Sequence, residues 1–137
     1  MNRDSVEAWL KEYGVENYTI NEDLSVDVDG DVNLWSKDLL EIPIKFGRVS
    51  GYFSCSSNHL SSLVGCPISV GGDFYGYSNC LTILEGCPES VGGDFDCKMN
   101  DLKEEEWFLY NCTPEQIGLY YKNKKLIRLK ITQLMKI

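Results

Sequence analysis

Alternating acidic side chains are the first feature of this 137-residue sequence that could support chemistry. The run Asp27-Val28-Asp29-Gly30-Asp31 places carboxylates at every second position, and calcium is bound by such oxygen ligands. The other ligands of an EF-hand calcium loop are missing from the residues that follow. We therefore expect an exposed acidic strand face here and no metal site.

Asp73 and Asp94 are a second candidate, because two neighbouring carboxylates can act as general acid and general base. Each follows a glycine pair in the phrase VGGDF, which occurs at residues 70–74 and again at residues 91–95. One aspartate in each copy of a repeated phrase indicates a surface ladder. The glycine pairs are typical of places where backbones approach closely, and no phosphate-binding GxxxxGK motif occurs. We expect a protein that is not an enzyme and needs no cofactor.

The six cysteines and the only histidine, His59, are the remaining residues that could hold a metal or form disulfides. Cys66 and Cys87 are 21 residues apart, and Cys55 and Cys97 are 42 apart. If units of 21 residues stack as strands about 4.8 Å apart, the first pair is close enough for a disulfide and the second is not. Paired Cys-x-x-Cys or His-containing zinc clusters are missing. We expect free, buried thiols and a solvated turn at His59.

The positions of these residues follow a repeat of 21 residues in the middle of the chain. Besides VGGDF, the tripeptide Gly-Cys-Pro recurs at residues 65–67 and 86–88. Four columns keep one residue type over three successive units: Val49, Val70 and Val91; Phe53, Phe74 and Phe95; Asn58, Asn79 and Asn100; Leu60, Leu81 and Leu102. A degenerate earlier unit continues the register with Val28, Gly30, Val32, Leu39 and Ile42. Self-similarity at this period predicts a solenoid.

Each unit of 21 residues, here called a rung, is expected to contain one strand and an irregular return. In the rung GGDFYGYSNCL, side-chain alternation sends Phe74, Gly76 and Leu81 inward and the residues between them outward. Asn79 is expected to turn inward at the end of the strand, where its amide can satisfy backbone groups of the adjacent turn. The Gly-Cys-Pro segment then returns the chain along the convex side in extended backbone.

These phrases resemble the short leucine-rich-repeat-like proteins of large tailed bacteriophages and some bacteria. The resemblance rests on IPIKFGRVSGYFSCSSNHL and SLVGCPISVGGDFYGYSNCLTILEGCPESVGGDFDC, and it covers residues 23–102. It implies a leucine-rich-repeat-like solenoid, a fold generally used for protein binding. The chain departs from the pattern at Gly76, where neighbouring rungs have cysteine, and at Glu105, where leucine is expected. We therefore expect the array to end near Leu102.

The N-terminal segment has the features of a cap, which a solenoid needs to cover its end rung. A helix is expected to begin with Asp4 or Ser5 as N-cap and to end near Tyr13, with Trp9 in the core and Gly14 as a stop. Residues 18–28 then alternate as the two strands of a hairpin.

The C-terminal segment has the features of a second cap. Thr113, Pro114 and Gln116 form a capping-box pattern that starts a helix, and residues 126–137 continue it as either helix or strand. One domain is expected, with residues 1–27 as N-terminal cap, residues 28–102 as four repeats, and residues 103–137 as C-terminal cap with a basic tail.

Charge is distributed unevenly along the chain. Residues 1–110 contain 7 Lys or Arg and 20 Asp or Glu, a net charge of −13, whereas residues 111–137 contain 6 and 1, a net charge of +5. The acidic repeats argue against direct nucleic-acid binding, which needs a basic surface. The basic residues 122–130 fit a capping element with a solvated face better than a phosphate or membrane contact. No apolar run approaches the roughly 20 residues of a membrane span and no signal-peptide core is evident, so we expect a cytoplasmic protein.

The outward strand face is where we expect the function. Exposed aromatic side chains on a sheet are typical of interface hot spots, and core packing gives no reason for them to point outward. The expected partner-binding residues are Asp31, Asn33, Trp35, Tyr52, Asp73, Tyr75, Tyr77, Asp94 and Asp96, with Ser54, Ser56 and Lys98 exposed beside them.

We expect a protein-binding module whose partner is a host or phage protein. The bacteriophage resemblance implies an inhibitor or modulator of a host protein, and a host defence protein is one such target. Two alternatives stay open: a DNA mimic that occupies a nucleic-acid-binding cleft through its acidic face, and a structural or assembly component of a virion.

Overall fold

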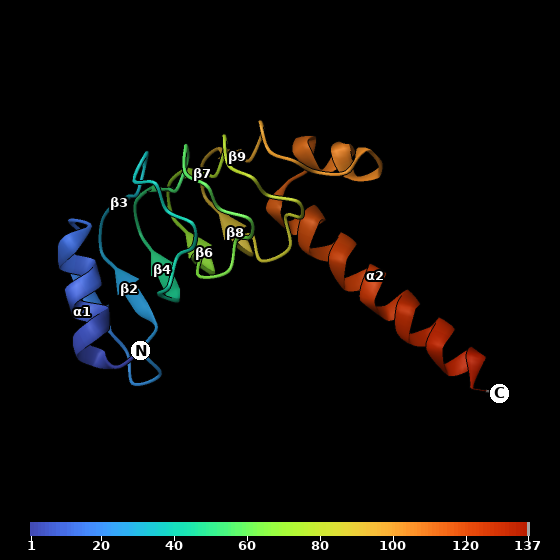
Figure 1. Ribbon diagram of the computed structural model, residues 1–137, viewed down its shortest axis with the longest axis horizontal. Coiled ribbons are helices and arrows are strands. Elements are labelled where there is room, and N and C mark those ends of the chain that lie inside the picture. Colours follow the sequence, from blue (N-terminus) through green and yellow to red (C-terminus); the bar gives the residue numbers. More distant parts are fainter. Residues whose placement is uncertain (137) are drawn as a thin grey trace.

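Residues 21 positions apart lie side by side in parallel strands, so the repeat in the sequence is the pairing register of the structure. The computed structural model of the protein describes residues 1–136, a β-solenoid of about three turns followed by a long C-terminal helix (Figure 1). One sheet has the order β1-β2-β4-β6-β8 and the other β3-β5-β7-β9. The strands are β1 (Tyr18–Ile20), β2 (Val26–Val28), β3 (Val32–Asn33), β4 (Phe46–Val49), β5 (Phe53–Ser54), β6 (Ser69–Val70), β7 (Phe74–Tyr75), β8 (Ser90–Val91) and β9 (Phe95–Asp96).

Each repeat contributes two short strands, one to each sheet, which corrects the expectation of one strand and an irregular return. Val49 pairs with Val70 in the first sheet, and Phe53 pairs with Phe74 in the second. A tight turn separates the two strands, and it contains a glycine. No larger residue fits at Gly71, because a Cβ there would overlap the carbonyl oxygen of Ser50 on the preceding rung. Only the third side of each rung, from the asparagine to the next strand, is irregular.

A phenylalanine ladder fills the solenoid between the two sheets. The rings of Phe53 and Phe74 are stacked with centroids 5.7 Å apart, and those of Phe74 and Phe95 are 5.5 Å apart. Phe53 and Phe74 are fully buried, but Phe95 is only half-buried because β9 is the edge strand of its sheet. The ladder is therefore continuous, but its last member is not fully buried. Gly76 and Leu81 point inward as expected, and a Cβ at Gly76 would lie 3.1 Å from Cys97 Sγ.

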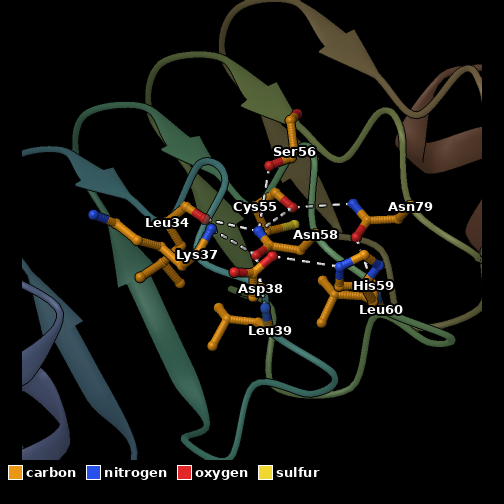
Figure 2. Close-up of polar contacts among 10 residues, drawn as sticks. All are labelled: Leu34, Lys37, Asp38, Leu39, Cys55, Ser56, Asn58, His59, Leu60 and Asn79. Carbon is orange, nitrogen blue, oxygen red and sulfur yellow. Dashed lines mark hydrogen bonds and ion pairs between the residues drawn. The ribbon is translucent and has the colours of Figure 1, made fainter.

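A second ladder of asparagine side chains joins the turns that follow the second sheet (Figure 2). Asn79 Nδ2 donates to the carbonyl oxygen of Cys55 at 3.0 Å, and Asn79 Oδ1 accepts from the backbone nitrogen of Leu60 at 3.0 Å. Asn58 does the same one rung earlier, with Leu34 and Leu39 as its partners. Each buried amide thus satisfies backbone groups of the preceding rung, which confirms the expected inward turn.

The residue before the asparagine has a left-handed backbone in every rung. The φ angles are 56° at Ser57, 54° at Ser78 and 56° at Met99. This conformation is uncommon for residues other than glycine, and Ser36 also adopts it at the same position of the first rung, where no asparagine follows, with a φ of 54°.

The N-terminal cap is helix α1 (Arg3–Glu12) together with the β1–β2 hairpin, which is antiparallel as expected. Asn2 is the N-cap, and its side chain accepts from the backbone nitrogen of Ser5 at 2.9 Å. The expected N-caps Asp4 and Ser5 are therefore wrong, because both lie within the first turn of the helix. Trp9 is half-buried at the edge of the core rather than inside it.

The C-terminal cap contains the 3₁₀ helix η1 (Glu104–Asn111) and helix α2 (Pro114–Met135). Thr113 and Gln116 form the expected capping box, with hydrogen bonds of 3.2 Å and 2.9 Å. Residues 126–135 continue as helix rather than strand, while Ile137 lies outside the described residues. Helix α2 leaves the last rungs and projects away from the stack (Figure 1).

Glu106 fixes the base of α2 to the cap. Its buried carboxylate accepts from the hydroxyls of Tyr120 at 2.8 Å and Tyr121 at 3.1 Å, and from Lys124 Nζ at 2.9 Å. Burial opposes ionisation of Glu106, but these three donors outweigh it and hold its pKa below the ordinary value. Tyr121 also accepts from the backbone nitrogen of Leu84, so the helix base is tied to the last rungs.

Candidate functional site

The expected site residues lie together on the outer side of the sheet β3-β5-β7-β9, a surface here called the strand face. Asp31, Asn33, Trp35 and Asp94 are exposed on it, and Tyr52, Asp73, Tyr75, Tyr77 and Asp96 are half-buried. They occupy three columns because each strand pairs with the next at an offset of 21 residues. The sheet therefore brings side chains from four separate segments onto one surface.

An open hollow with a volume of about 260 Å³ lies in the strand face. Trp35 is 54% exposed at one side of it, and the rings of Tyr75 and Tyr77 meet edge to face at the other, with centroids 6.2 Å apart. The lining residues are Asn33, Trp35, Tyr52, Ser54, Tyr75 and Tyr77. A hollow lined by aromatic rings can seat an aliphatic side chain or, through cation–π attraction, a cationic one.

Ser54 and Ser56 are buried on this face, which corrects the expectation that both are exposed. Ser56 occupies the same column as Trp35 and Tyr77, and the bulk of these neighbours covers the small side chain between them. Its hydroxyl is the one buried side-chain oxygen or nitrogen without a hydrogen-bond partner in residues 1–136. The serines therefore form the floor of the surface, and the aromatic residues form its contact area.

The aspartates of the strand face also hold neighbouring rungs together. Asp31 Oδ1 accepts from the backbone nitrogen of Tyr52 at 2.8 Å, and Asp73 Oδ1 accepts from that of Asp94 at 2.7 Å. A Cβ at Gly93 would overlap Asp73 Oδ1, so the glycine makes room for the carboxylate. The ladder predicted for Asp73 and Asp94 is present, but Asp73 is half-buried and both of its carboxylate oxygens accept hydrogen bonds from the protein.

Tyr75 and Asp73 form a polar pair at the edge of the hollow. The Tyr75 hydroxyl donates to Asp73 Oδ2 at 2.9 Å, and this hydrogen bond raises the pKa of Tyr75. The bond restrains the orientation of the Tyr75 ring, which lines the hollow. Sequence reasoning placed both residues on the surface but missed their contact, which links residues two apart on the same rung.

The other sheet carries a larger hollow of about 410 Å³, away from the expected site. Two of its carboxylates make contacts between rungs: Asp27 Oδ1 accepts from the backbone nitrogen of Arg48, and Asp29 Oδ1 accepts from the Ser50 hydroxyl. It has no aromatic lining residue. The run at residues 27–31 thus supplies ladder carboxylates, and residues 1–136 contain no group of three or more His, Cys, Asp or Glu side chains that could hold a metal ion.

Three of the six cysteines lie in the interior, but Cys80 is exposed and Cys87 and Cys112 are only half-buried, so the expectation of buried thiols is wrong for these three. Cys55, Cys66 and Cys97 are buried, and a hydrogen bond with Cys55 together with burial raises the pKa of Cys66. Burial likewise raises the pKa of Cys97, and it raises that of Cys87 to about 12. The comparison of equivalent repeat positions related Cys66 to Cys87 and missed the contact between Cys66 and Cys55. Thiols that stay protonated at neutral pH are poor nucleophiles and poor metal ligands.

His59 lies exposed beside the asparagine ladder, as expected for a solvated turn residue (Figure 2). Its Nε2 is 3.5 Å from Asp38 Oδ1, and both side chains are largely exposed. In the part of the chain that the structure describes, no helix has the length and apolar content needed to cross a bilayer.

Comparisons with protein-family models, with curated proteins and with solved structures found no match for this chain.

Proposed function

We propose that the protein is a non-enzymatic binding module that holds another protein on its strand face. The observation that carries the proposal is the hollow of about 260 Å³, in which Trp35, Tyr75 and Tyr77 stay accessible although the core does not need them. Aromatic side chains supply much of the binding energy at protein interfaces. Tyr75 lies in β7, and the backbone on either side of Trp35 and Tyr77 is hydrogen-bonded to the next rung, so little conformational entropy is lost on binding.

The chemistry of the surface favours a basic partner. Asp31, Asp73 and Asp94 belong to the column on one side of this face, Asp96 lies beside Tyr75 on the last rung, and Lys98 is the one cation in the same three columns. Such a surface attracts a positively charged patch and accelerates encounter with it. A lysine or arginine of the partner can then seat against the tyrosine rings.

The repeat phrases support a biological setting for this activity. Their resemblance to leucine-rich-repeat-like bacteriophage proteins supports a phage-encoded inhibitor or modulator of a host protein in the cytoplasm, with defence proteins among the targets. A nucleic-acid-binding host protein is one basic partner that fits, and the acidic columns would then act as a DNA mimic.

The test is affinity capture from host lysate with immobilised protein, followed by mass spectrometry. The Tyr75→Ser/Tyr77→Ser variant should lose the captured protein, because a buried interfacial aromatic residue contributes about 2 kcal/mol or more. Leu40→Ser/Val64→Ser is the matched control, since both side chains are more than 70% exposed on the irregular side of the rungs.

Thermal melts of both variants should stay close to that of the wild type. A protein that binds all three forms equally would place the site elsewhere. Displacement of the captured protein by duplex DNA would assign the acidic columns to DNA mimicry, and recovery of the chain in purified virions would assign it to the particle.

A further inference from the structure

The outer part of α2, residues 122–135, is here called the arm, and its apolar side chains are uncovered. Residues 126–135 are all exposed, and six of them are large apolar residues with exposed fractions between 47% and 81%: Leu126, Ile127, Leu129, Ile131, Leu134 and Met135. Ile127, Ile131 and Leu134 follow at helical spacing and share one side. A helix in water gains most of its stability from packing such a side against another surface.

The arm is also strongly basic. After Glu115 the chain has no acidic residue and six Lys or Arg. Within residues 1–136, only Lys124 and Lys125 of the arm form ion pairs, with Glu106 and Glu85 at its base. Two arms placed side by side would therefore repel each other, and the surface that covers the arm should be acidic.

The strand face is an acidic and aromatic surface that this chain itself provides. An arm cannot reach the strand face of its own chain, because Glu106 and the buried residues Ile117 and Tyr121 fix its base while the helix points away from the stack (Figure 1). Contact between the two surfaces therefore requires two molecules.

The two surfaces agree in length. The sheet β3-β5-β7-β9 has strands about 4.8 Å apart, so the strand face extends about 14 Å along the solenoid axis. Residues 126–135 of the arm extend about 15 Å at 1.5 Å per residue. On the arm, Arg128 and Lys130 flank the apolar side that Ile127 and Ile131 form. An apolar centre with basic edges matches an aromatic hollow that has a column of aspartates beside it.

We propose that the arm of one copy binds across the strand face of a second copy. Ile127 and Ile131 lie against the aromatic hollow, and Arg128 and Lys130 lie among the aspartates. The proposal rests on the proposed function, because it names one occupant of the same face. The two contacting surfaces differ, so the interface is heterologous and copies join head to tail, into a closed ring or an open chain according to the rotation between them.

The first experiment measures the mass of the full chain by sedimentation equilibrium at rising concentration. In about 50 mM salt the average mass should rise with concentration, and in about 500 mM salt the rise should be smaller, because salt screens charge pairs. A wild-type protein that stays monomeric at every concentration in low salt overturns the proposal. Binding of such a monomer to vesicles of anionic lipid would assign the arm to a membrane surface instead.

The second experiment mixes two variants. The arm variant Arg128→Glu/Lys130→Glu keeps an intact strand face, and the face variant Asp94→Lys/Asp96→Asn keeps an intact arm. Asparagine at position 96 retains the acceptor for the backbone nitrogen of Lys98, as Asn33 does for Trp35. Each variant alone should self-associate at least about tenfold more weakly than the wild type. An equimolar mixture should form heterodimers, since each supplies the surface that the other lacks.

Self-association of the face variant as strong as that of the wild type, or no heterodimer in the mixture, overturns the proposal. Circular dichroism melts of both variants establish that they are folded. The outcome is separate from that of the proposed function, because the arm variant can be used in the lysate capture. A foreign protein that binds the arm variant but not the Tyr75→Ser/Tyr77→Ser variant would leave the proposed function intact even if self-association fails.

Discussion

The carboxylate of Asp73 bonds to the backbone of Asp94, with Oδ1 2.7 Å from the amide nitrogen on the next rung. The two residues occupy one repeat column, yet only Asp73 has a rung stacked after it, because β9 is the edge strand. The same residue type therefore has a structural role at one position and a surface role at the other.

Asp73→Ala should lower the free energy of unfolding by about 1 to 2 kcal/mol, because it leaves the Asp94 amide without its charged acceptor. Asp73→Asn retains an oxygen acceptor and should recover most of this loss. Asp94→Ala is the matched control and should change the stability by less than about 0.5 kcal/mol. Urea unfolding of the three variants measures these differences, and equal losses at both aspartates would contradict the rung-to-rung bond.

Phe74→Ala should cost about 3 to 5 kcal/mol, as expected for an aromatic side chain buried between two stacked rings. Phe95→Ala should cost less, about 2 kcal/mol, because the edge ring is already half-exposed. Denaturant melts of both variants provide the comparison. A larger loss at Phe95 would mean that the last rung is covered more fully than its position at the sheet edge implies.

Acid should loosen the C-terminal cap through Glu106. The folded-state pKa of this residue lies below its ordinary value of 4.5, so its contribution to stability is present above that pH and is lost as pH falls through the folded-state pKa. Glu106→Gln should lower the stability at pH 7 by about 2 to 3 kcal/mol, because three donors lose a charged acceptor.

Urea melts of the wild type and Glu106→Gln at several pH values between 7 and 3 test this linkage. The stability difference between the two proteins should shrink below pH 4.5. A difference that stays constant down to pH 3 would show that the carboxylate does not act through its charge.

Thiol labelling should separate the cysteines by burial. In a short pulse of iodoacetamide on the native protein, the exposed Cys80 should react first, and Cys66 and Cys97 should stay protected. Both protected thiols are buried with raised pKa values, and the thiolate is the reactive form. Peptide mass spectrometry identifies the alkylated cysteines, and all six thiols should be labelled after unfolding. Equal rates at Cys66 and Cys80, or fewer than six labelled thiols, would contradict this assignment.

Much of the solenoid could be predicted from the sequence because its contacts repeat. The columns of Val49 and Phe53 pair at the offset of 21 residues found in the sequence, and Asn79 makes the inward bonds expected of it. The second strand of each rung was missed. In the last two rungs only two residues form it, such as Ser69 and Val70, and two residues are too few for side-chain alternation to reveal a strand.

The candidate site could be predicted only in part. Sequence alternation placed Tyr75 and Tyr77 on the outside, but it could not show that they enclose a hollow with Trp35, which lies two rungs away. The structural role of Asp73 had one signal, the glycine at position 93, whose missing side chain makes room for the carboxylate. The exposure of the arm had no signal in the sequence, since its apolar residues would suit a packed cap equally well.

The bonds between rungs of this protein join each unit only to the next one. Asn79 bonds to the turn before it, Asp73 to the strand after it, and both do so with backbone groups that any further copy would also present. The number of repeat units can therefore change without any new type of contact between rungs. Duplication of residues 70–90 within the gene should insert one more strand into each parallel sheet, lengthen the binding surface by about 4.8 Å and leave both ends as they are. Recombination between its own repeats thus gives this protein a simple genetic route to partners of different size.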